Sequence, residues 1–388
     1  MKRIQERLNA LESQGLYRKL NVFSGAHGTK MILEGREVLL FCTNDYLGLA
    51  ADQRLKTAAI KAINDYGFGT GSSRLISGTL DLHEKLESKI AGFKKKEAAI
   101  LFNSGYDTNC GTISTLVGKG DTIFCDRLNH ASILDGARLS GAALKRFSHR
   151  DTVSLEKLLK KSSNASTRLV ITDGVFSMDG DVAPLPELSR LAKKYDAFLM
   201  VDDAHATGVI GKEGRGTPEY FGLEGEVDIH MGTLSKAVGS IGGFVACSSE
   251  VKKFLINRSR NFIYTTSLPP AAIAASLEGV SIIEESPFLR EKLLKNATFL
   301  RSCLCDAGFD TMTSELHIIP VLLGSDSVAL KANQLLLQKG VFVPAIRHPT
   351  VPKGGARLRI SLCAGHEKED VEKVLKAVIE TGKELGVI

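Results

Sequence analysis

The chain of 388 residues has an ordinary globular composition, with 43% hydrophobic and 24% charged residues. The length predicts two or three domains of roughly 100–200 residues each, and the composition excludes a disordered or fibrous protein. The net charge of +6 is modest and scattered along the chain, so no nucleic-acid partner is expected. No apolar stretch approaches the roughly 20 residues of a membrane-spanning helix, and residues 1–20 lack the apolar centre of a secretory signal. We therefore expect a cytoplasmic protein with no membrane partner.

The first segment, residues 1–20, has Ile4, Leu8 and Leu11 at helical spacing among charged residues and predicts a helix. Farther along, short apolar runs alternate with helix-length segments. The strands expected from these runs are Ala98–Phe102, Thr122–Cys125, Leu169–Thr172, Phe198–Val201 and Ile229–Met231. Such alternation is typical of a mostly parallel, doubly wound α/β sheet, in which ligands bind at the carboxyl ends of the strands.

The pattern changes near residues 268–270, where a long helical stretch begins. The elements expected beyond it are helices over Ala271–Glu285 and Leu289–Ala307, strands at Ile318–Leu323 and Leu358–Leu362, and a closing helix from Lys368. These elements predict a smaller α+β domain. We expect an N-terminal helix and arm over residues 1–42, a large domain over 43–270 and the C-terminal domain over 271–388.

Several common chemistries lack their sequence motifs. The chain has no Gly-x-x-x-x-Gly-Lys-Ser/Thr phosphate loop and no Gly-x-Ser-x-Gly hydrolase elbow. His83 and His366 are each followed by glutamate, but neither has a second histidine four residues later, as helical zinc ligation requires. Cys303 and Cys305 have no second cysteine pair nearby. No metal site is expected.

Three polar segments, each following an expected strand, stand out together at residues 173–181, 201–208 and 232–239. Asp202 ends an apolar strand, His205 follows three residues later, and Lys236 lies among small residues about 30 positions beyond it. A pyridoxal 5′-phosphate enzyme needs a lysine amine to hold the cofactor and a carboxylate to keep the ring nitrogen protonated. Its phosphate group needs backbone amides and hydroxyls at the start of a helix.

Each of these residues also has an ordinary structural interpretation. An aspartate after a strand is usually a helix cap, an isolated lysine is usually solvated, and His130 and His205 are each compatible with loop histidines. The glycine-rich segments alone indicate tight turns. Because the residues occur together, in order and at strand ends of one sheet, we favour a pyridoxal-phosphate site.

The sequence resembles the α-oxoamine synthases, a family of fold-type-I pyridoxal-phosphate enzymes. The resemblance runs from Thr43-Asn-Asp-Tyr-Leu-Gly-Leu49 to Arg357-Leu-Arg-Ile360. Ile263–Pro270 and Ala345–Pro352 are most similar to the branch of the family that makes 8-amino-7-oxononanoate, although His348 stands where that branch often has proline. The resemblance implies a mostly parallel sheet with a smaller C-terminal domain, and a homodimer with shared active sites.

The resemblance also implies roles for the residues around the cofactor ring. Lys236 would hold the cofactor and act as the base at the amino-acid Cα. Asp202 would pair with the ring nitrogen, and His130 would stack on the ring. His205, together with Ser177, would meet the phenolic oxygen.

For the cofactor phosphate, the resemblance implies the backbone amides of Gly105 and Tyr106 and the hydroxyl of Thr233. Thr265 or Thr266 would reach the phosphate from a second subunit.

For the substrates, Asn44 and Arg359 match positions that hold the amino-acid carboxylate. From the residues alone, the favoured interpretation is that Arg357 and Arg359, two apart in a strand, share one solvated face. Arg347 and Arg18 are candidate partners of the far carboxylate of a pimeloyl chain, because a buried negative charge needs a cation.

The implied reaction condenses L-alanine with a pimeloyl thioester, carried by coenzyme A or by acyl carrier protein, with loss of carbon dioxide. Its product, 8-amino-7-oxononanoate, is a biotin precursor. The alternatives are glycine C-acetyltransferase and, in the same family, 5-aminolevulinate synthase or serine palmitoyltransferase. A scaffold without turnover would be expected to have lost Lys236.

Overall fold

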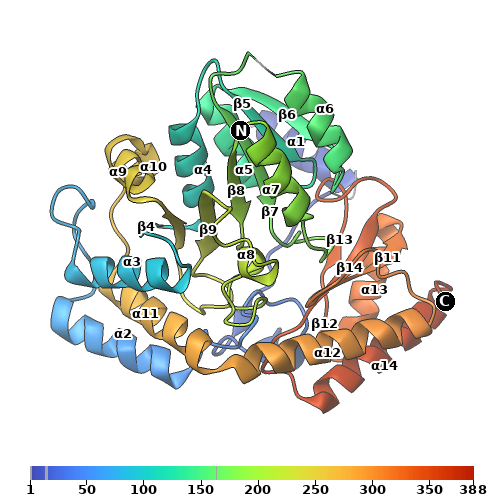
Figure 1. The fold of residues 1–388 in the computed structure, drawn as a ribbon. Helices are drawn as coiled ribbons and strands as arrows, with labels where there is room; N and C mark the ends of the chain where they lie inside the picture. Colours follow the sequence, from blue (N-terminus) through green and yellow to red (C-terminus); the bar gives the residue numbers. More distant parts are fainter. Residues whose placement is uncertain (1, 14–15, 163) are drawn as a thin grey trace.

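The computed structural model describes residues 2–13, 16–162 and 164–388. At its centre is a seven-stranded sheet in the order β4-β10-β9-β8-β7-β5-β6 (Figure 1). Neighbouring strands from β9 to β6 are parallel, and β10 is antiparallel to both β4 and β9. The strands are β4 (Ala98–Phe102), β5 (Thr122–Asp126), β6 (Ala143–Phe147), β7 (Arg168–Asp173), β8 (Phe198–Asp202), β9 (Ile229–Thr233) and β10 (Gly243–Cys247).

The central sheet is buried on both faces. In β7, Leu169 and Ile171 belong to a core shared with α4, α5 and α9, while Val170 between them belongs to a second core shared with α6 and α7. This division follows from the two-residue period of a strand. The helices concerned are α4 (Gly105–Leu116), α5 (Ala131–Ser140), α6 (Thr152–Lys160), α7 (Leu185–Lys194) and α9 (Ser249–Arg258).

The N-terminal region contributes a helix, a small sheet and two further helices. Strands β1, β2 and β3 pair in sequence, and β3 also pairs in parallel with β12 from the C-terminal region. The N-terminal arm is thereby joined to the C-terminal region by backbone hydrogen bonds. The elements are α1 (Lys2–Ser13), β1 (Phe23–Ser24), β2 (Lys30–Leu33), β3 (Arg36–Leu40), α2 (Gln53–Tyr66) and α3 (Asp81–Phe93).

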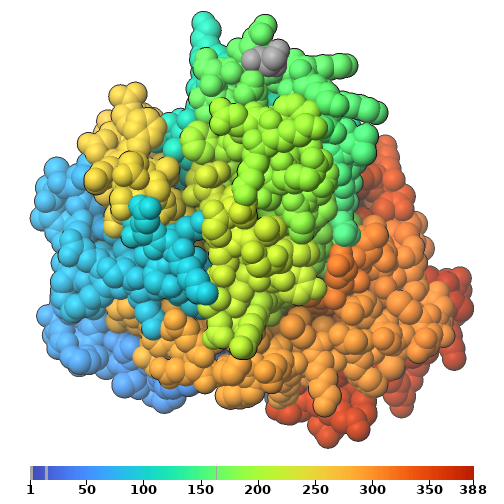
Figure 2. Space-filling model, viewed as in Figure 1, coloured from blue at the N-terminus to red at the C-terminus, as the bar shows by residue number. Residues whose placement is uncertain are grey.

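The C-terminal region, orange to red in Figure 2, fills one flank of the molecule. Helix α11 packs on α2 and α3, and α12 packs on α14. A three-stranded antiparallel sheet has the order β11-β14-β13. The elements are α11 (Pro270–Glu285), α12 (Pro287–Asp306), β11 (Ile318–Gly324), α13 (Asp326–Gln338), β12 (Val341–Phe342), β13 (Ala345–Ile346), β14 (Ala356–Ser361) and α14 (Lys368–Glu384); two short helices, α8 (Thr217–Tyr220) and α10 (Arg260–Ile263), precede them.

The strands and C-terminal helices predicted from apolar runs are confirmed, each within two residues of its expected bounds. The N-terminal helix is shorter than expected: it ends at Ser13, and residues 16–20 are not helical. The expected helix also included residues 1, 14 and 15, which lie outside the described residues.

Two strands of the central sheet were not predicted. Strand β6 is an edge strand in which Lys145 and Arg146 interrupt the apolar pattern. Strand β10 begins at Gly243, directly after a glycine-rich stretch that indicated only a turn. Within the described part of the chain, no helix has both the length and the apolar character that crossing a bilayer requires.

Candidate active site

A cavity of about 250 Å³ lies at the carboxyl ends of the central strands. Parallel strands bring the residues that follow them to one edge of the sheet, so segments far apart in sequence meet there. Among the residues that line this cavity are seven of those predicted to bind the cofactor: Gly105, Tyr106, His130, Asp202, His205, Thr233 and Lys236.

Lys236 is half-buried and lines both this cavity and an adjoining one of about 410 Å³. Burial lowers the pKa of its amine to about 8, although the carboxylates of Asp202 and Asp173 oppose the shift. The turn after it closes at Gly239, with φ of 75°, where an added Cβ would lie 2.7 Å from the backbone nitrogen of Ala50. The lysine is thus held on a tightly packed turn, and a larger fraction of its amine is unprotonated at neutral pH than for a solvated lysine.

Asp202 ends β8 at the floor of the cavity and is buried. Its Oδ2 accepts a 2.7 Å hydrogen bond from Nδ2 of Asn109, and its Oδ1 accepts a 2.9 Å bond from the backbone nitrogen of Ala204. Asn109 projects from α4 and also donates to Oγ of Ser132. These two donors fix the orientation of the carboxylate toward the cavity.

His205 and Tyr46 form a buried pair beside the cavity. The Tyr46 hydroxyl lies 2.6 Å from Nδ1 of His205 and donates a 3.2 Å hydrogen bond to Oδ1 of Asn44. Burial lowers the pKa of His205 well below its ordinary value, so the ring is neutral at pH 7. A neutral imidazole can both donate and accept a hydrogen bond, which suits contact with a phenolic oxygen.

His130 caps the N-terminus of α5 and borders the cavity. Its Nδ1 lies 2.7 Å from Oγ of Ser132 and accepts a hydrogen bond from the Ser132 backbone nitrogen. Burial lowers the pKa of His130, which favours the neutral ring. Because Nδ1 is engaged with Ser132, the orientation of the imidazole plane is set by α5.

The part of the cavity lined by Ser104, Gly105 and Thr233 is suited to an anion. Helix α4 begins there, capped by Ser104, whose hydroxyl accepts from the Asp107 backbone nitrogen. A Cβ at Gly105 would lie 3.3 Å from Cε of Met231 and 3.5 Å from Oγ1 of Thr233, so glycine keeps this end open. Exposed backbone amides at a helix N-terminus bind phosphate groups well.

These residues together fit pyridoxal 5′-phosphate. The 250 Å³ cavity, called the cofactor cavity from here on, combines a helix N-terminus for the phosphate, the buried carboxylate of Asp202 for a cationic ring nitrogen, and the amine of Lys236 for covalent attachment.

Arg359 and Arg357 are both buried, so the alternative of a shared solvated face is wrong. Arg359 donates from Nε to the Ser177 carbonyl oxygen at 2.5 Å and from Nη1 to Oγ of Ser361 at 2.8 Å. Arg357 donates from Nη1 to Oδ1 of Asp179 at 2.7 Å. Strand β14 therefore presents both guanidinium groups to the turn that follows β7.

The remaining predicted residues lie outside the 250 Å³ cavity. Asn44 lines the adjoining cavity with Lys236, and Ser177 lines a larger cleft of about 720 Å³ that also borders His130. Thr265 accepts a 2.8 Å hydrogen bond at Oγ1 from Nδ2 of Asn103, and the backbone of Thr266 is bridged to Ser73. Neither threonine lines the cavity within this chain.

Arg18 and Arg347 lie close together but away from the cavity. Arg18 donates from Nη2 to Oγ1 of Thr350 at 3.2 Å, and Arg347 donates from Nη2 to the Tyr17 carbonyl oxygen at 3.2 Å. Thr350 lines the 720 Å³ cleft.

Sequence reasoning missed Tyr46, Asn109 and Asp173. Tyr46 lies inside the Thr43–Leu49 stretch that carried the family resemblance, and Asp173 ends an apolar strand as Asp202 does. The sequence therefore contained a signal for each of these two residues. Asn109 is in the middle of a helix, where no sequence pattern marks it.

Comparison with known proteins agrees with this geometry. The family model for aminotransferase class I and II matches residues 36–378. The chain belongs to this family. The 8-amino-7-oxononanoate synthase of Citrifermentans bemidjiense is 50% identical over 390 residues, covering 100% of both chains.

Solved structures of related enzymes share the fold of the chain. Serine palmitoyltransferase of Sphingomonas wittichii superposes with a TM-score of 0.94 at 37% identity, covering 99% of this chain and 97% of that one. The 8-amino-7-oxononanoate synthase of Francisella tularensis superposes with a TM-score of 0.79 at 30% identity, covering 90% and 99%. The expected fold-type-I architecture is confirmed, and the chain is a pyridoxal-phosphate-dependent transferase.

Proposed function

We propose that this enzyme condenses L-alanine with a pimeloyl thioester to give 8-amino-7-oxononanoate, carbon dioxide and a free thiol. The observation that carries the proposal is full-length identity of 50% with synthases of that name, combined with a cavity that presents Lys236 and Asp202 together. The reaction forms a bond between the amino-acid Cα and the thioester carbonyl carbon. It breaks the carbon–sulfur bond, releasing the thiol with a proton, and the bond to the carboxylate carbon, releasing carbon dioxide.

In this reaction the chain supplies the cofactor attachment and the proton transfers. When bound, pyridoxal phosphate supplies an electron-withdrawing ring that accepts the electron pair released at Cα. Asp202, oriented by Asn109 and Ala204, keeps a proton on the ring nitrogen because an anion favours the charged form of its partner. The Lys236 amine, with its pKa lowered to about 8, takes the Cα proton near neutral pH.

Arg359 is the residue we assign to the amino-acid carboxylate. Its guanidinium is buried and already oriented by the Ser177 carbonyl and the Ser361 hydroxyl. A planar guanidinium binds a carboxylate at two points, which fixes the direction of the bonds at Cα. Asn44, held by Tyr46 beside the same lysine, completes this end of the site.

The acyl donor fits the cleft of about 720 Å³ that borders His130 and Ser177. Arg127 and Arg146 lie along this cleft and are exposed. Guanidinium groups in such a place suit the phosphates of coenzyme A or the acidic surface of a carrier protein.

We further propose a homodimer in which a second copy of the chain covers the surface beside the active site. Phe68, Ile76 and Tyr264 are 80%, 81% and 72% exposed, and the bridge from Ser73 to Thr266 brings their segments together. Clustered exposed apolar side chains of this size mark an interface. Thr265 and Thr266, on the same surface, would then complete the partner's phosphate site.

The proposal is tested by measuring kcat/KM for L-alanine, glycine and L-serine against pimeloyl-, acetyl- and palmitoyl-coenzyme A. We expect the pair of L-alanine and pimeloyl-coenzyme A to give the highest value. The structural likeness to serine palmitoyltransferase makes L-serine with palmitoyl-coenzyme A the second candidate, and a preference for that pair would replace the proposal.

A further inference from the structure

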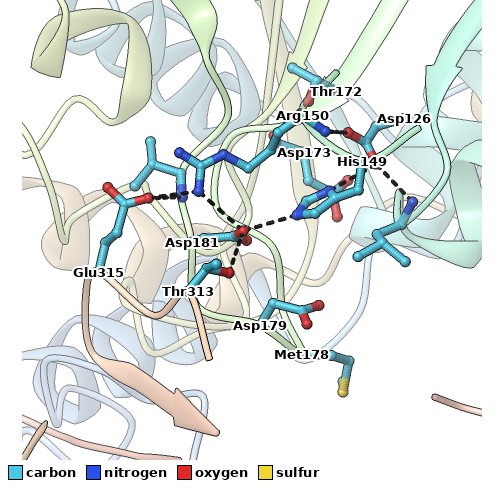
Figure 3. A network of polar contacts seen from close by, with 12 residues as sticks. Asp126, His149, Arg150, Thr172, Asp173, Met178, Asp179, Asp181, Thr313 and Glu315 are labelled. Atoms are coloured by element: carbon cyan, nitrogen blue, oxygen red, sulfur yellow. Dashed lines mark hydrogen bonds and ion pairs between the residues drawn. The ribbon is translucent and has the colours of Figure 1, made fainter. Parts of the chain in front are cut away.

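His149 lies between two buried carboxylates outside the cofactor cavity (Figure 3). Its Nδ1 is 3.0 Å from Oδ1 of Asp126, at the end of β5, and its Nε2 is 2.9 Å from Oδ2 of Asp181. A neutral imidazole carries one N–H group, so only the protonated ring donates to both carboxylates. Burial by itself lowers the pKa of His149, but the hydrogen bonds to Asp126 and Asp181 outweigh it and raise the pKa to about 9.

Asp181 closes a turn over residues 176–181. The Phe176 backbone nitrogen donates to the Asp181 carbonyl oxygen at 3.0 Å, and the Asp181 side chain accepts from His149, Arg150 and Thr313. The ring of Phe176 also stands edge-on to His149, with centroids 4.5 Å apart. His149 therefore contacts both ends of the turn.

The same turn accepts hydrogen bonds from both arginines of β14. The Ser177 carbonyl oxygen accepts the 2.5 Å hydrogen bond from Nε of Arg359, and Asp179 accepts from Arg357. Because these contacts involve the backbone and side chains of one short turn, a shift of the turn displaces the Arg359 guanidinium.

We propose that charged His149 is a positioning residue for amino-acid binding: it fixes the 176–181 turn, and the turn orients Arg359 toward the substrate carboxylate. The proposal rests on the proposed function, in which Arg359 binds that carboxylate. His149 lines neither the 250 Å³ cavity nor the 720 Å³ cleft, so its effect passes through the turn.

The proposal carries a pH dependence. The charged groups around His149 are Asp126 on β5, Asp181 on the turn and Arg150 beside it. Arg150 also pairs with Glu315. The negative charge of Asp126 contributes to the raised pKa of Asp173 on β7. Since folding raises the pKa of His149, both hydrogen bonds are present at neutral pH, and one of them is lost as the pH rises through about 9, because the neutral ring keeps a single N–H group. Above that value, a lone pair of the ring faces a carboxylate.

The test is L-alanine binding to the holoenzyme without an acyl donor, followed by the change in cofactor absorbance. We expect His149→Gln to raise the dissociation constant by about tenfold at about pH 7, since hydrogen bonds between charged groups are lost. Because Lys236 and the alanine amine also titrate, the quantity to follow is the ratio of variant to wild-type constants. It should fall toward one at about pH 10, where wild-type His149 is itself neutral.

Thr313→Val is the matched control. It removes an uncharged donor from the same Asp181 oxygen while leaving the contact with His149, so alanine binding should stay close to wild type even if thermal stability falls. In an Arg359→Ala background, His149→Gln should add no further loss, because the two residues act in series.

Asp181→Asn changes the other partner of the His149 contact and should cause the same loss of alanine affinity. This second variant keeps the test decisive if His149→Gln does not fold. Wild-type affinity for L-alanine in either folded variant, or an equal loss in Thr313→Val, would overturn the positioning role while leaving the proposed function intact. A wild-type enzyme that binds neither L-alanine nor glycine would overturn both.

Discussion

Asp173 and Asp202 lie opposite each other in register at the carboxyl ends of β7 and β8, and both are buried in the cofactor cavity. Burial, reinforced by the negative charge of Asp202, raises the pKa of Asp173 well above its ordinary value. Asp173 therefore favours its neutral form. Asp202 accepts hydrogen bonds on both of its oxygens, from Asn109 and from the Ala204 backbone. Two chemically identical side chains are thus given different tasks by their surroundings.

The first prediction separates these two carboxyl groups. Asp202→Asn should reduce kcat/KM by about a hundredfold or more, since it removes a charge from the reacting centre. Asp173→Asn should stay within a few-fold of wild type, because an amide closely imitates a neutral carboxyl group. Steady-state kinetics of both variants provide the measurement, together with their cofactor content and their rate of Cα proton exchange. Equal losses in the two variants would contradict the division of roles.

The second prediction concerns the Lys236 amine. In enzyme stripped of cofactor, the rate of reattachment of pyridoxal phosphate should rise with pH and level off above about pH 8, the lowered pKa of this lysine, rather than near the ordinary value of about 10.4. The sign follows because only the unprotonated amine is a nucleophile. Borohydride reduction followed by peptide mapping should locate the cofactor on Lys236. A label on another lysine would refute the assignment.

The third prediction concerns the dimer. A Lys236→Ala chain and a Thr265→Ala, Thr266→Ala chain should each be inactive, yet mixed dimers should recover part of the activity, because one of their two sites contains neither defect. The mixed species is isolated with two different affinity tags. Absence of recovery in isolated mixed dimers would count against shared sites, once the threonine variant has been shown to be inactive by itself.

The fourth prediction divides the arginines by substrate. Arg359→Ala should raise the KM for the amino acid by about a hundredfold, since losing one partner of a buried charge pair costs on the order of 3 kcal/mol. Arg347→Ala should chiefly weaken pimeloyl thioesters and spare hexanoyl- and acetyl-coenzyme A, which lack the far carboxylate. Steady-state kinetics with all three donors measure both effects. If Arg347→Ala weakened the three donors alike, its carboxylate role would be excluded.

Much of this account could be predicted from the sequence because the cofactor demands chemically specific residues at strand ends. Asp202 ends an apolar run, and Lys236 stands among small residues after the next strand. The apolar runs indicate where these two strands, β8 and β9, end. Strand β10 could not be recognised in the same way, since it starts at Gly243 in a glycine-rich stretch and pairs against the direction of its neighbours.

The missing parts of the site depend on contacts between distant segments. Asn109, which was not predicted, reaches Asp202 across 93 positions of sequence. Arg359 and Ser177 were both predicted as site residues from the family resemblance, but the contact between them, across 182 positions, was not. Nothing local distinguishes these side chains from other polar residues on a helix or a strand. The burial of Arg357 and Arg359, likewise, follows from the turn packed against them, which the two-residue spacing does not indicate.

The most direct test of the central claim is an incubation of the enzyme with pimeloyl-coenzyme A and L-alanine labelled with carbon-13 at either the carboxyl or the methyl carbon. The account predicts that carboxyl label is released as carbon dioxide in equal amount to free thiol, while methyl label is retained in a ketone with the mass of 8-amino-7-oxononanoate. Thiol release without labelled carbon dioxide, or a ketone product that forms only when glycine replaces alanine, would contradict it.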